Sequence, residues 1–219
     1  MKYRCLIFDH DDTVVNSTVM IHYPALLGYL KEYRNGVGAD MTKEQYFEYN
    51  FDPGIYGMFR DILGMNDEDV KEEEAYWVRY VEEHVPKAFP GIKEILETHR
   101  KNGGLFFMSS HSFRNYIIRD FRKNDLPLPD EIYGWELPKE LRKPAPYSIE
   151  QIEKNFHVKR EEMLMIDDLR TGYDMAKATG IAFAAAGWAH TEKSIEDFMR
   201  SHADYYCKTV NDLRAVLEE

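Results

Sequence analysis

Four carboxylates with the spacing of catalytic groups follow two apolar segments of this chain. Asp9 and Asp11 stand two positions apart in "FDHDDT", directly after the apolar run "CLIF". Asp167 and Asp168 follow the apolar run "MLMI" in the same way. An isolated Asp-x-Asp is also typical of a turn or a helix cap, so the second pair changes the interpretation. Carboxylates on neighbouring strand ends would form an acidic cluster, and a hard cation such as Mg²⁺ is a suitable neutralising partner.

A serine pair and a lysine add groups that suit a phosphate. Ser109 and Ser110 end the apolar run "LFFMSS", where hydroxyls and freed backbone N–H groups can hold phosphate oxygens. Lys143 stands in "LRKPAPYS", ahead of two prolines that restrict the backbone around it. Serines after a strand and solvated lysines are common, so each signal alone is weak. The ordered set of acid pair, serines, lysine and acid pair indicates phosphate chemistry.

Strands and helices alternate along most of the chain, which predicts the scaffold for these groups. Short apolar runs rich in β-forming residues predict buried strands; these runs cover residues 4–8, 105–110, 163–167 and 181–187. Helical patterns such as "FPGIKEILETHRKNGG" and "APYSIEQIEKNFHV" stand between them. Such alternation predicts an α/β fold with a Rossmann-like parallel sheet covered on both faces. In these sheets ligands bind outside the carboxyl ends of the strands, where the polar groups above lie.

The segment from about residue 16 to residue 86 has a different character. It shows no clear strand signal and is rich in Tyr, Phe, Met and acidic residues, and "DEDVKEEEAYWVRYVEEHV" has the pattern of an amphipathic helix. We therefore expect a core domain of residues 1–15 and 87–219 and a helical cap domain of residues 16–86. The turn-rich "NFDPGIYG" (50–57) and Arg60 are candidate contacts to the active site, although helix packing and a solvated arginine are the simpler interpretation.

The order of these motifs resembles the haloacid dehalogenase superfamily of phosphotransferases. The matching pieces are "FDHDDT", "FFMSS", "RKPAP" and "MIDDLRTGYDMAKATG", which span the predicted core from end to end. "KPAP" with its lysine 25 positions before Asp168 is similar to the branch of beta-phosphoglucomutase and phosphoglycolate phosphatase. In that branch a helical insert after the first motif forms a mobile cap, which agrees with the expected cap of residues 16–86.

The resemblance implies roles for the first motif. Asp9 would be the nucleophile that attacks phosphorus and forms an aspartyl-phosphate. Asp11 would protonate the leaving alcohol and then activate water, and its backbone carbonyl would contact the metal. Thr13 would brace the loop. Asp12 and His10 receive no chemical role, because His10 occupies a variable position and Asp12 one where relatives place a small turn residue.

The resemblance also implies how the phosphate and the metal would be held. Ser109 and the backbone of Ser110 would bind the transferring phosphoryl group, and Lys143 would neutralise charge between it and the nucleophile. Asp168, with help from Asp167, would hold Mg²⁺ together with the first-motif acids. Relatives often have Gly at position 167 and Asn at position 110, so Asp167 is expected as a secondary ligand and the Ser110 side chain has no assured role.

These expectations favour a Mg²⁺-dependent hydrolase of a small phosphorylated metabolite, a phosphate monoester. The near alternative in the same family is a sugar-phosphate phosphomutase, which passes the phosphoryl group from the aspartate to substrate instead of water. A receiver-like domain or a non-catalytic phosphate-binding protein is the alternative of another class. The paired acids at 167–168 and the helical insert count against a receiver domain.

Composition excludes several other partners. The chain of 219 residues carries a net charge of −11 and no Lys/Arg run, so nucleic-acid binding is not expected. No segment has the pattern of a signal peptide or a membrane span, which gives a cytoplasmic location as the default. Cys5 and Cys207 are expected as reduced thiols. The oligomeric state stays open, with a monomer as the default.

Overall fold

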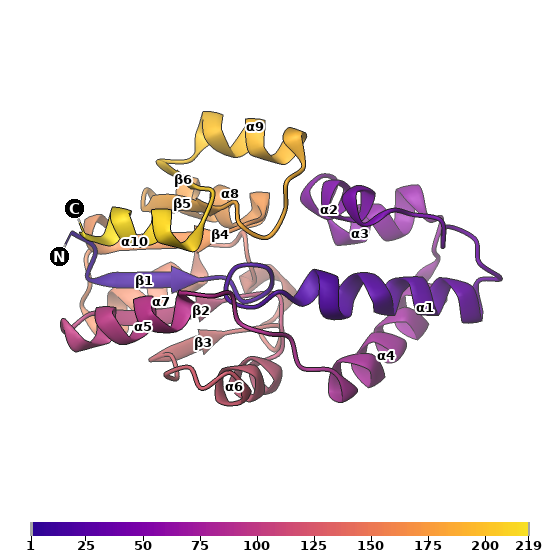
Figure 1. The fold of residues 1–219 in the computed structure, drawn as a ribbon, viewed down its shortest axis with the longest axis horizontal. Coiled ribbons are helices and arrows are strands. Elements are labelled where there is room, and N and C mark those ends of the chain that lie inside the picture. The colour runs from indigo at the N-terminus through magenta and orange to yellow at the C-terminus, as the bar shows by residue number, and fades with distance from the viewer. Residues whose placement is uncertain (1, 219) are drawn as a thin grey trace.

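A parallel β-sheet forms the centre of the protein in the computed structural model, which describes residues 2–218 (Figure 1). Its strands are β1 (Cys5–Phe8), β2 (Leu105–Ser109), β3 (Glu131–Tyr133), β4 (Met163–Asp167), β5 (Ala182–Ala186) and β6 (Tyr205–Cys207). They lie in the order β3-β2-β1-β4-β5-β6, and every neighbouring pair is parallel. The predicted α/β fold with a parallel sheet is therefore confirmed.

The register of the three central strands places the polar residues of their ends together. Phe8 lies opposite Met108 on one side and Ile166 on the other. The next residues along the three strands are therefore Asp9, Ser109 and Asp167, which reach the carboxyl edge of the sheet side by side. Since β1 is flanked by strands that come much later in the chain, this edge is assembled from distant segments.

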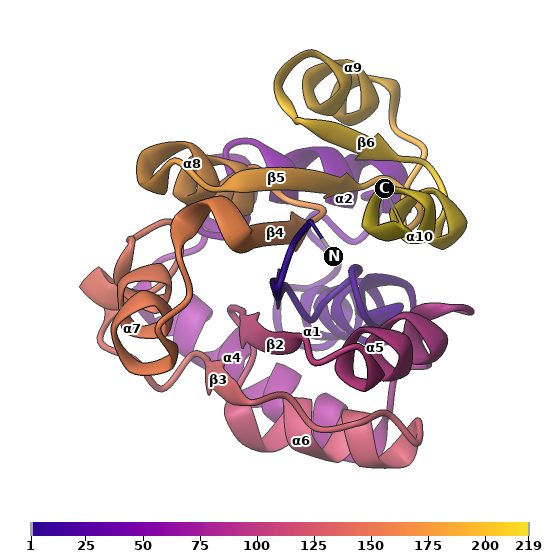
Figure 2. The ribbon, with the colours of Figure 1, turned by 90° about the vertical axis from the view of Figure 1, so that its left-hand side faces the viewer.

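Helices cover both faces of the sheet, as expected for parallel strands buried on two sides (Figure 2). One face packs against α5 (Ile92–Lys101), α6 (Arg114–Lys123) and α10 (Val210–Glu218). The other face packs against α7 (Tyr147–Phe156), α8 (Arg170–Thr179) and α9 (Lys193–His202). Alternate residues of β1 enter the two hydrophobic clusters, with Leu6 and Phe8 on the first face and Cys5 and Ile7 on the second.

A separate group of helices lies beyond the carboxyl end of the sheet (Figure 1). It comprises the π-helical turn η1 (Thr18–His22), α1 (Tyr23–Tyr33), α2 (Lys43–Phe51), α3 (Ile55–Gly57), the π-helical turn η2 (Met58–Ile62) and α4 (Asp67–Glu83). These helices share a hydrophobic cluster of their own, which includes Leu26, Tyr29 and Met58. We call them the cap helices; the division into domains at residues 15 and 87 stays a prediction.

Local sequence signals account for the ends of several helices. Asn66 caps α4 by accepting from the backbone N–H groups of Glu68 and Asp69, and the Asp69 side chain accepts from the Asn66 N–H. Acidic residues fill the first turn of α4, where their negative charge interacts favourably with the positive end of the helix dipole. Gly180 ends α8 with a φ of +72°, a left-handed conformation that favours glycine.

The remaining ordered segments are short, with the 3₁₀ turns η3 (Lys139–Leu141) and η4 (Arg160–Glu162) between core elements. The three-residue edge strand β3 has no counterpart in the sequence prediction, because its apolar signal covers only Ile132 and Tyr133. Cys5 and Cys207 are both free thiols, buried in β1 and β6. Among residues 2–218 the structure has no helix that is long and apolar enough to cross a membrane.

Candidate active site

A buried lysine joins two carboxylates at the carboxyl edge of the sheet. The Lys143 Nζ lies 2.7 Å from Asp9 Oδ1 and 2.6 Å from Asp167 Oδ2. All three side chains are at most 5% exposed. Burial lowers the pKa of Lys143, but the charges of Asp167 and Asp9 raise it by more, so that the ammonium stays charged. A charged lysine in this position places positive charge directly beside the Asp9 carboxylate.

Asp9, Asp167 and Asp168 form an acidic cluster next to this lysine. One carboxylate oxygen of each lies within 4.8 Å of the others, close enough for all three to hold one metal ion. Burial raises the pKa of Asp168 well above its usual value, and the charges of Asp12, Asp167 and Asp9 add to the rise. A cation would relieve this repulsion, and a set of carboxylate oxygens suits a hard divalent ion. The residues present therefore fit a metal site.

Two small residues complete the surroundings of the acidic cluster. Thr13 Oγ1 donates to Asp168 Oδ1 at 3.3 Å, so the first loop supports the second acid pair. Asp167 Oδ1 accepts from the Leu169 N–H at 2.8 Å, which fixes the side chain at the start of α8. Gly172 in α8 allows this approach, because a Cβ there would lie 2.2 Å from Asp167 Oδ2.

Asp11 turns away from the acidic cluster and toward the cap helices. Its Oδ1 lies 3.1 Å from His22 Nε2, and its Oδ2 accepts a hydrogen bond from Ser112 Oγ. The Trp77 indole N–H donates to His22 Nδ1 at 2.9 Å. Because an indole N–H can only donate, Nδ1 is the acceptor and Nε2–H donates to Asp11. Burial raises the pKa of Asp11, but its interactions with His22 and Ser112 lower it by more and hold the carboxylate ionised.

The loops that follow β1 and β2 offer backbone donors for an anion. The backbone N–H groups of His10, Asp11 and His111 make no hydrogen bond within the described residues, and they stand next to Asp9 and Ser109. Ser109 Oγ lies 3.1 Å from Ser148 Oγ. The Ser110 N–H already donates to the Tyr133 carbonyl at 3.0 Å as part of the sheet. The donor that sequence reasoning placed at Ser110 is therefore better supplied by His111.

The first loop is fixed by contacts on two further sides. The His10 side chain is 1% exposed, and its Nε2 lies 3.1 Å from Asp120 Oδ2. Asp120 Oδ1 in turn accepts from Arg119, which also donates to the Val81 carbonyl near the end of α4. Asp12 adopts a left-handed φ of 56° and accepts from the Thr18 N–H at the start of the cap helices. Asp12 thus performs the local backbone work expected of it.

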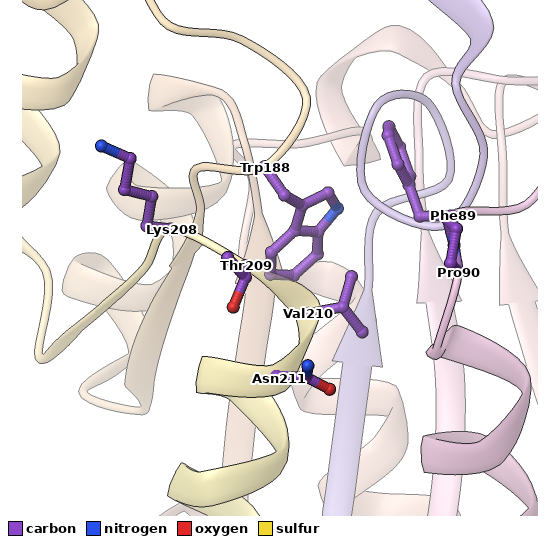
Figure 3. Close-up of a pocket in the computed structure, with 7 residues that line it drawn as sticks. All are labelled: Phe89, Pro90, Trp188, Lys208, Thr209, Val210 and Asn211. Atoms are coloured by element: carbon purple, nitrogen blue, oxygen red, sulfur yellow. The ribbon is translucent and has the colours of Figure 1, made fainter.

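The indole of Trp188 also contacts the loop that follows β1. Its N–H donates to the Thr13 carbonyl at 3.1 Å. The ring also lies beside a surface hollow of about 320 Å³ (Figure 3). The hollow is lined by Phe89, Pro90, Trp188, Lys208, Thr209, Val210 and Asn211. The lining of this hollow includes none of the acidic residues, and its connection to the site is the hydrogen bond from Trp188 to Thr13.

Three further contacts between the cap helices and the core lie around the site. The ring of Phe47 in α2 lies 5.6 Å from the ring of His190, whose Nε2 is 4.0 Å from Asp168 Oδ2. Burial lowers the pKa of His190 to about 4, so this imidazole is neutral. Tyr56 in α3 stacks on Trp135, with ring centroids 6.4 Å apart. The third contact is the Asp11–His22 bond, so the cap helices approach the site both near Asp168 and at Asp11.

The family of the chain follows from its match to a known family model. The model described as haloacid dehalogenase-like hydrolase matches residues 6–186, which include the acidic cluster, Lys143, Asp11 and Ser109. The chain is a member of the haloacid dehalogenase-like hydrolases. The resemblance of its motifs to that superfamily is therefore confirmed, and the receiver-domain alternative is excluded. No curated protein matches this chain.

Solved structures of other haloacid dehalogenase-like proteins share the fold over nearly the whole chain. One from Bacteroides fragilis is 21% identical with a TM-score of 0.79, covering 97% of this chain and 100% of its own. A predicted phosphoglycolate phosphatase from Haemophilus somnus is 17% identical with a TM-score of 0.72, covering 99% of both chains. A CbbY variant from Rhodobacter sphaeroides, solved with xylulose-(1,5)-bisphosphate, is 17% identical with a TM-score of 0.72, covering 95% of both chains.

For this haloacid dehalogenase-like hydrolase, the structure brings together most residues singled out in the sequence. Asp9, Lys143, Asp167 and Asp168 meet directly, and Ser109 follows the neighbouring strand. The Asp11 carboxylate stands apart from the cluster, so any metal contact must come from its backbone carbonyl. Their roles in catalysis stay predictions.

Arg60 pairs with Asp67 and donates to the Met65 carbonyl, which agrees with the simpler interpretation given for it. The His10 side chain binds Asp120, and its backbone N–H remains a candidate phosphate donor. Sequence reasoning missed two residues. His22 and Trp77 were not predicted as site residues. Trp77 lies in the segment predicted as an amphipathic helix, where aromatic residues usually serve packing, and no local pattern marks His22 as a partner of Asp11.

Proposed function

We propose that this protein is a Mg²⁺-dependent phosphatase that hydrolyses a small phosphate monoester through an aspartyl-phosphate on Asp9. The observation that carries the proposal is the Lys143 ammonium, which lies between Asp9 and Asp167 at 2.7 and 2.6 Å. It provides positive charge beside the nucleophile Asp9, where the phosphoryl group would arrive. The burial of Asp9 beneath the cap helices supports a small substrate, a phosphorylated metabolite.

In the first step, an Asp9 carboxylate oxygen attacks phosphorus and the bond from phosphorus to the alcohol oxygen breaks. The alcohol oxygen takes a proton from Asp11. Because the dianionic substrate disfavours a second negative charge nearby, its arrival raises the pKa of Asp11 and lets this residue carry the proton. The backbone N–H groups of His10, Asp11 and His111, with Ser109, hold the phosphoryl oxygens.

In the second step, Asp11 has become a carboxylate again and takes a proton from water. The water oxygen bonds to phosphorus, the bond from Asp9 to phosphorus breaks, and inorganic phosphate leaves. His22 and Ser112 orient the two oxygens of Asp11 throughout, because each donates to one of them. Asp11 is therefore held in one geometry for both proton transfers.

The metal would be held by Asp9, Asp168 and the backbone carbonyl of Asp11, with Asp167 nearby. Within residues 2–218 the Asp11 carbonyl accepts no hydrogen bond, which leaves it available as a ligand. When bound, Mg²⁺ would neutralise the charge of the phosphoryl group in the transition state. We also infer that the cap helices, within residues 16–86, act as the cap domain, and that the enzyme works in the cytoplasm.

Turnover of p-nitrophenyl phosphate with Mg²⁺ tests the proposal. Asp9→Asn should lose nearly all turnover while its thermal unfolding and circular dichroism stay those of the folded protein. Asp61→Asn, at an exposed position in the cap helices, is the matched control and should keep full activity. Unchanged hydrolysis by Asp9→Asn would contradict the mechanism. Release of one inorganic phosphate for each alcohol formed distinguishes a phosphatase from a phosphomutase.

A further inference from the structure

A largely buried glutamate of the cap helices has no hydrogen-bond or ion-pair partner within the described part of the chain. Glu73 of α4 is 7% exposed, although buried glutamates are rare unless paired. Within residues 2–218 its carboxyl group makes no hydrogen bond and no ion pair. Burial raises the pKa of Glu73 to about 7, and His22 is the one group that counteracts the rise. No lysine or arginine of residues 2–218 forms an ion pair with this carboxyl group.

Glu73 lies on the same helix as Trp77, which is hydrogen-bonded toward the side of the site where the alcohol would leave. Trp77 stands one helical turn further along α4, on the same face, because side chains at i and i+4 lie one above the other. Trp77 donates to His22, and His22 donates to Asp11, the residue that would protonate the leaving alcohol. Glu73 is therefore one turn beyond the residues that orient Asp11.

A second buried polar group shares this place. Tyr46 of α2 is 4% exposed, and its hydroxyl makes no hydrogen bond within the described residues. Burial raises the pKa of Tyr46 well above its usual value, and the charges of Glu73, Asp12 and Asp11 add to the rise, in that order. Tyr46 belongs to the hydrophobic cluster of the cap helices, against which Val70 packs, one turn before Glu73 on α4. The ring of Tyr23 packs on it at 5.9 Å.

We propose that Glu73 and Tyr46 receive the far end of the leaving alcohol, and that this end carries a cationic amino group. The oxygens of Glu73 and Tyr46 are not among the fully enclosed polar atoms that lack a partner in the described residues, so they stay accessible to a ligand that would pair with them. A cation suits Glu73 and the faces of the neighbouring aromatic rings, whereas a second phosphate or a carboxylate would be repelled. The substrate class is then the phosphate monoester of an amino alcohol, which rests on the proposed phosphatase function.

Three monoesters of similar length separate the charge of the leaving group from its size. O-phosphoethanolamine has a cationic end, 2-hydroxyethyl phosphate a neutral end and phosphoglycolate an anionic end. The wild-type protein should hydrolyse them in that order of kcat/KM, with about tenfold or more between the first and the last. An order led by phosphoglycolate or by the neutral ester would overturn the proposal.

Variants of Glu73 test the residue itself. Glu73→Gln should lower kcat/KM for O-phosphoethanolamine about tenfold and change it little for 2-hydroxyethyl phosphate. Glu73→Lys should reverse the order and favour phosphoglycolate. The neighbouring and exposed Glu74 gives the control, because Glu74→Gln should keep the wild-type order. Equal losses for all three esters in Glu73→Gln would assign Glu73 a structural role and reject the proposal.

Two further readouts separate this inference from the proposed function. Titration calorimetry of O-phosphoethanolamine and phosphoglycolate into Asp9→Asn measures recognition without turnover. Tighter binding of the cationic ester, lost with Glu73→Gln, would support the inference even if no ester were hydrolysed, and equal binding would refute it. Glu73→Gln should also unfold at the same or a higher temperature, because it removes an unpaired buried charge. A lower unfolding temperature would indicate a structural carboxylate instead.

Discussion

Lys143→Met should cost much of the stability of the metal-free protein, because it leaves two buried carboxylates without their cation. Each contact of the ammonium has a gross Coulomb energy of about 6 kcal/mol at an effective dielectric constant of about 20. Most of this is offset by the desolvation of the ammonium, and removing one partner of a buried pair costs about 3–5 kcal/mol. With an m-value of about 2–3 kcal/mol/M, the urea midpoint should fall by about 1–2 M.

The measurement is urea unfolding in EDTA, followed by tryptophan fluorescence, at several pH values. The loss should shrink as the pH is lowered from about 8 to about 5, since burial raises the pKa of Asp167 to about 7 in the wild-type protein and removal of the lysine raises it further. Asp167→Asn added to Lys143→Met should restore part of the stability. Lys193→Met is the control, because that lysine pairs with Asp197 at the surface and should have no measurable effect.

Turnover gives an independent view of the same lysine. Lys143→Met should lower kcat/KM for p-nitrophenyl phosphate by about 10²–10³, the usual cost of removing one group that stabilises charge in a transition state. A variant with a wild-type urea midpoint in EDTA would refute the assignment of a charged ammonium between the two acids. Failure of Asp167→Asn to recover any stability would show that the loss comes from packing and not from charge.

Three other perturbations follow from the geometry of the site. Gly172→Ala should displace the Asp167 carboxylate, cost about 1–3 kcal/mol and weaken Mg²⁺ binding by calorimetry. Metal-free protein should be more stable at pH 5 than at pH 8, because the raised pKa values of Asp167 and Asp168 confer stability at low pH that is lost as the pH rises through them. Saturating Mg²⁺ should reduce this trend in thermal unfolding. His22→Asn should lower kcat about 10–100-fold for poor leaving groups and shift the pH–rate profile, and Trp77→Phe should have a smaller effect of the same kind.

The scaffold was predictable from sequence because its signals are local. Each central strand is an apolar run that ends in a polar residue, so the runs before Asp9, Ser109 and Asp167 predicted both the sheet and the edge where the site lies. The edge strand β3 is too short to give such a signal. Lys143 lies in a loop, and only its place in an ordered series of motifs indicated that it belongs to the site.

The contacts between the cap helices and the core could not be predicted in the same way. The approach of His22 to Asp11 depends on how the helices of residues 16–86 sit on the sheet, which no periodicity encodes. The π-helical turn at Thr18–His22 also shifts the side chains that follow it relative to a regular helix. For Ser110, the sequence showed a backbone donor but not that the pairing of β2 with β3 already uses it.

The assembly of the site from distant strands also has a consequence for how the protein gains its activity as it folds. Asp9 and Lys143 are 134 positions apart, and the strands beside β1 in the sheet, β2 and β4, begin only at Leu105 and Met163. Contacts of such long range form slowly, because the chain must close large loops before they contribute. No fragment that ends before β4 contains the site. Recovery of turnover during refolding should therefore follow the slowest structural phase, and activity would report complete chain folding more strictly than helical circular dichroism does.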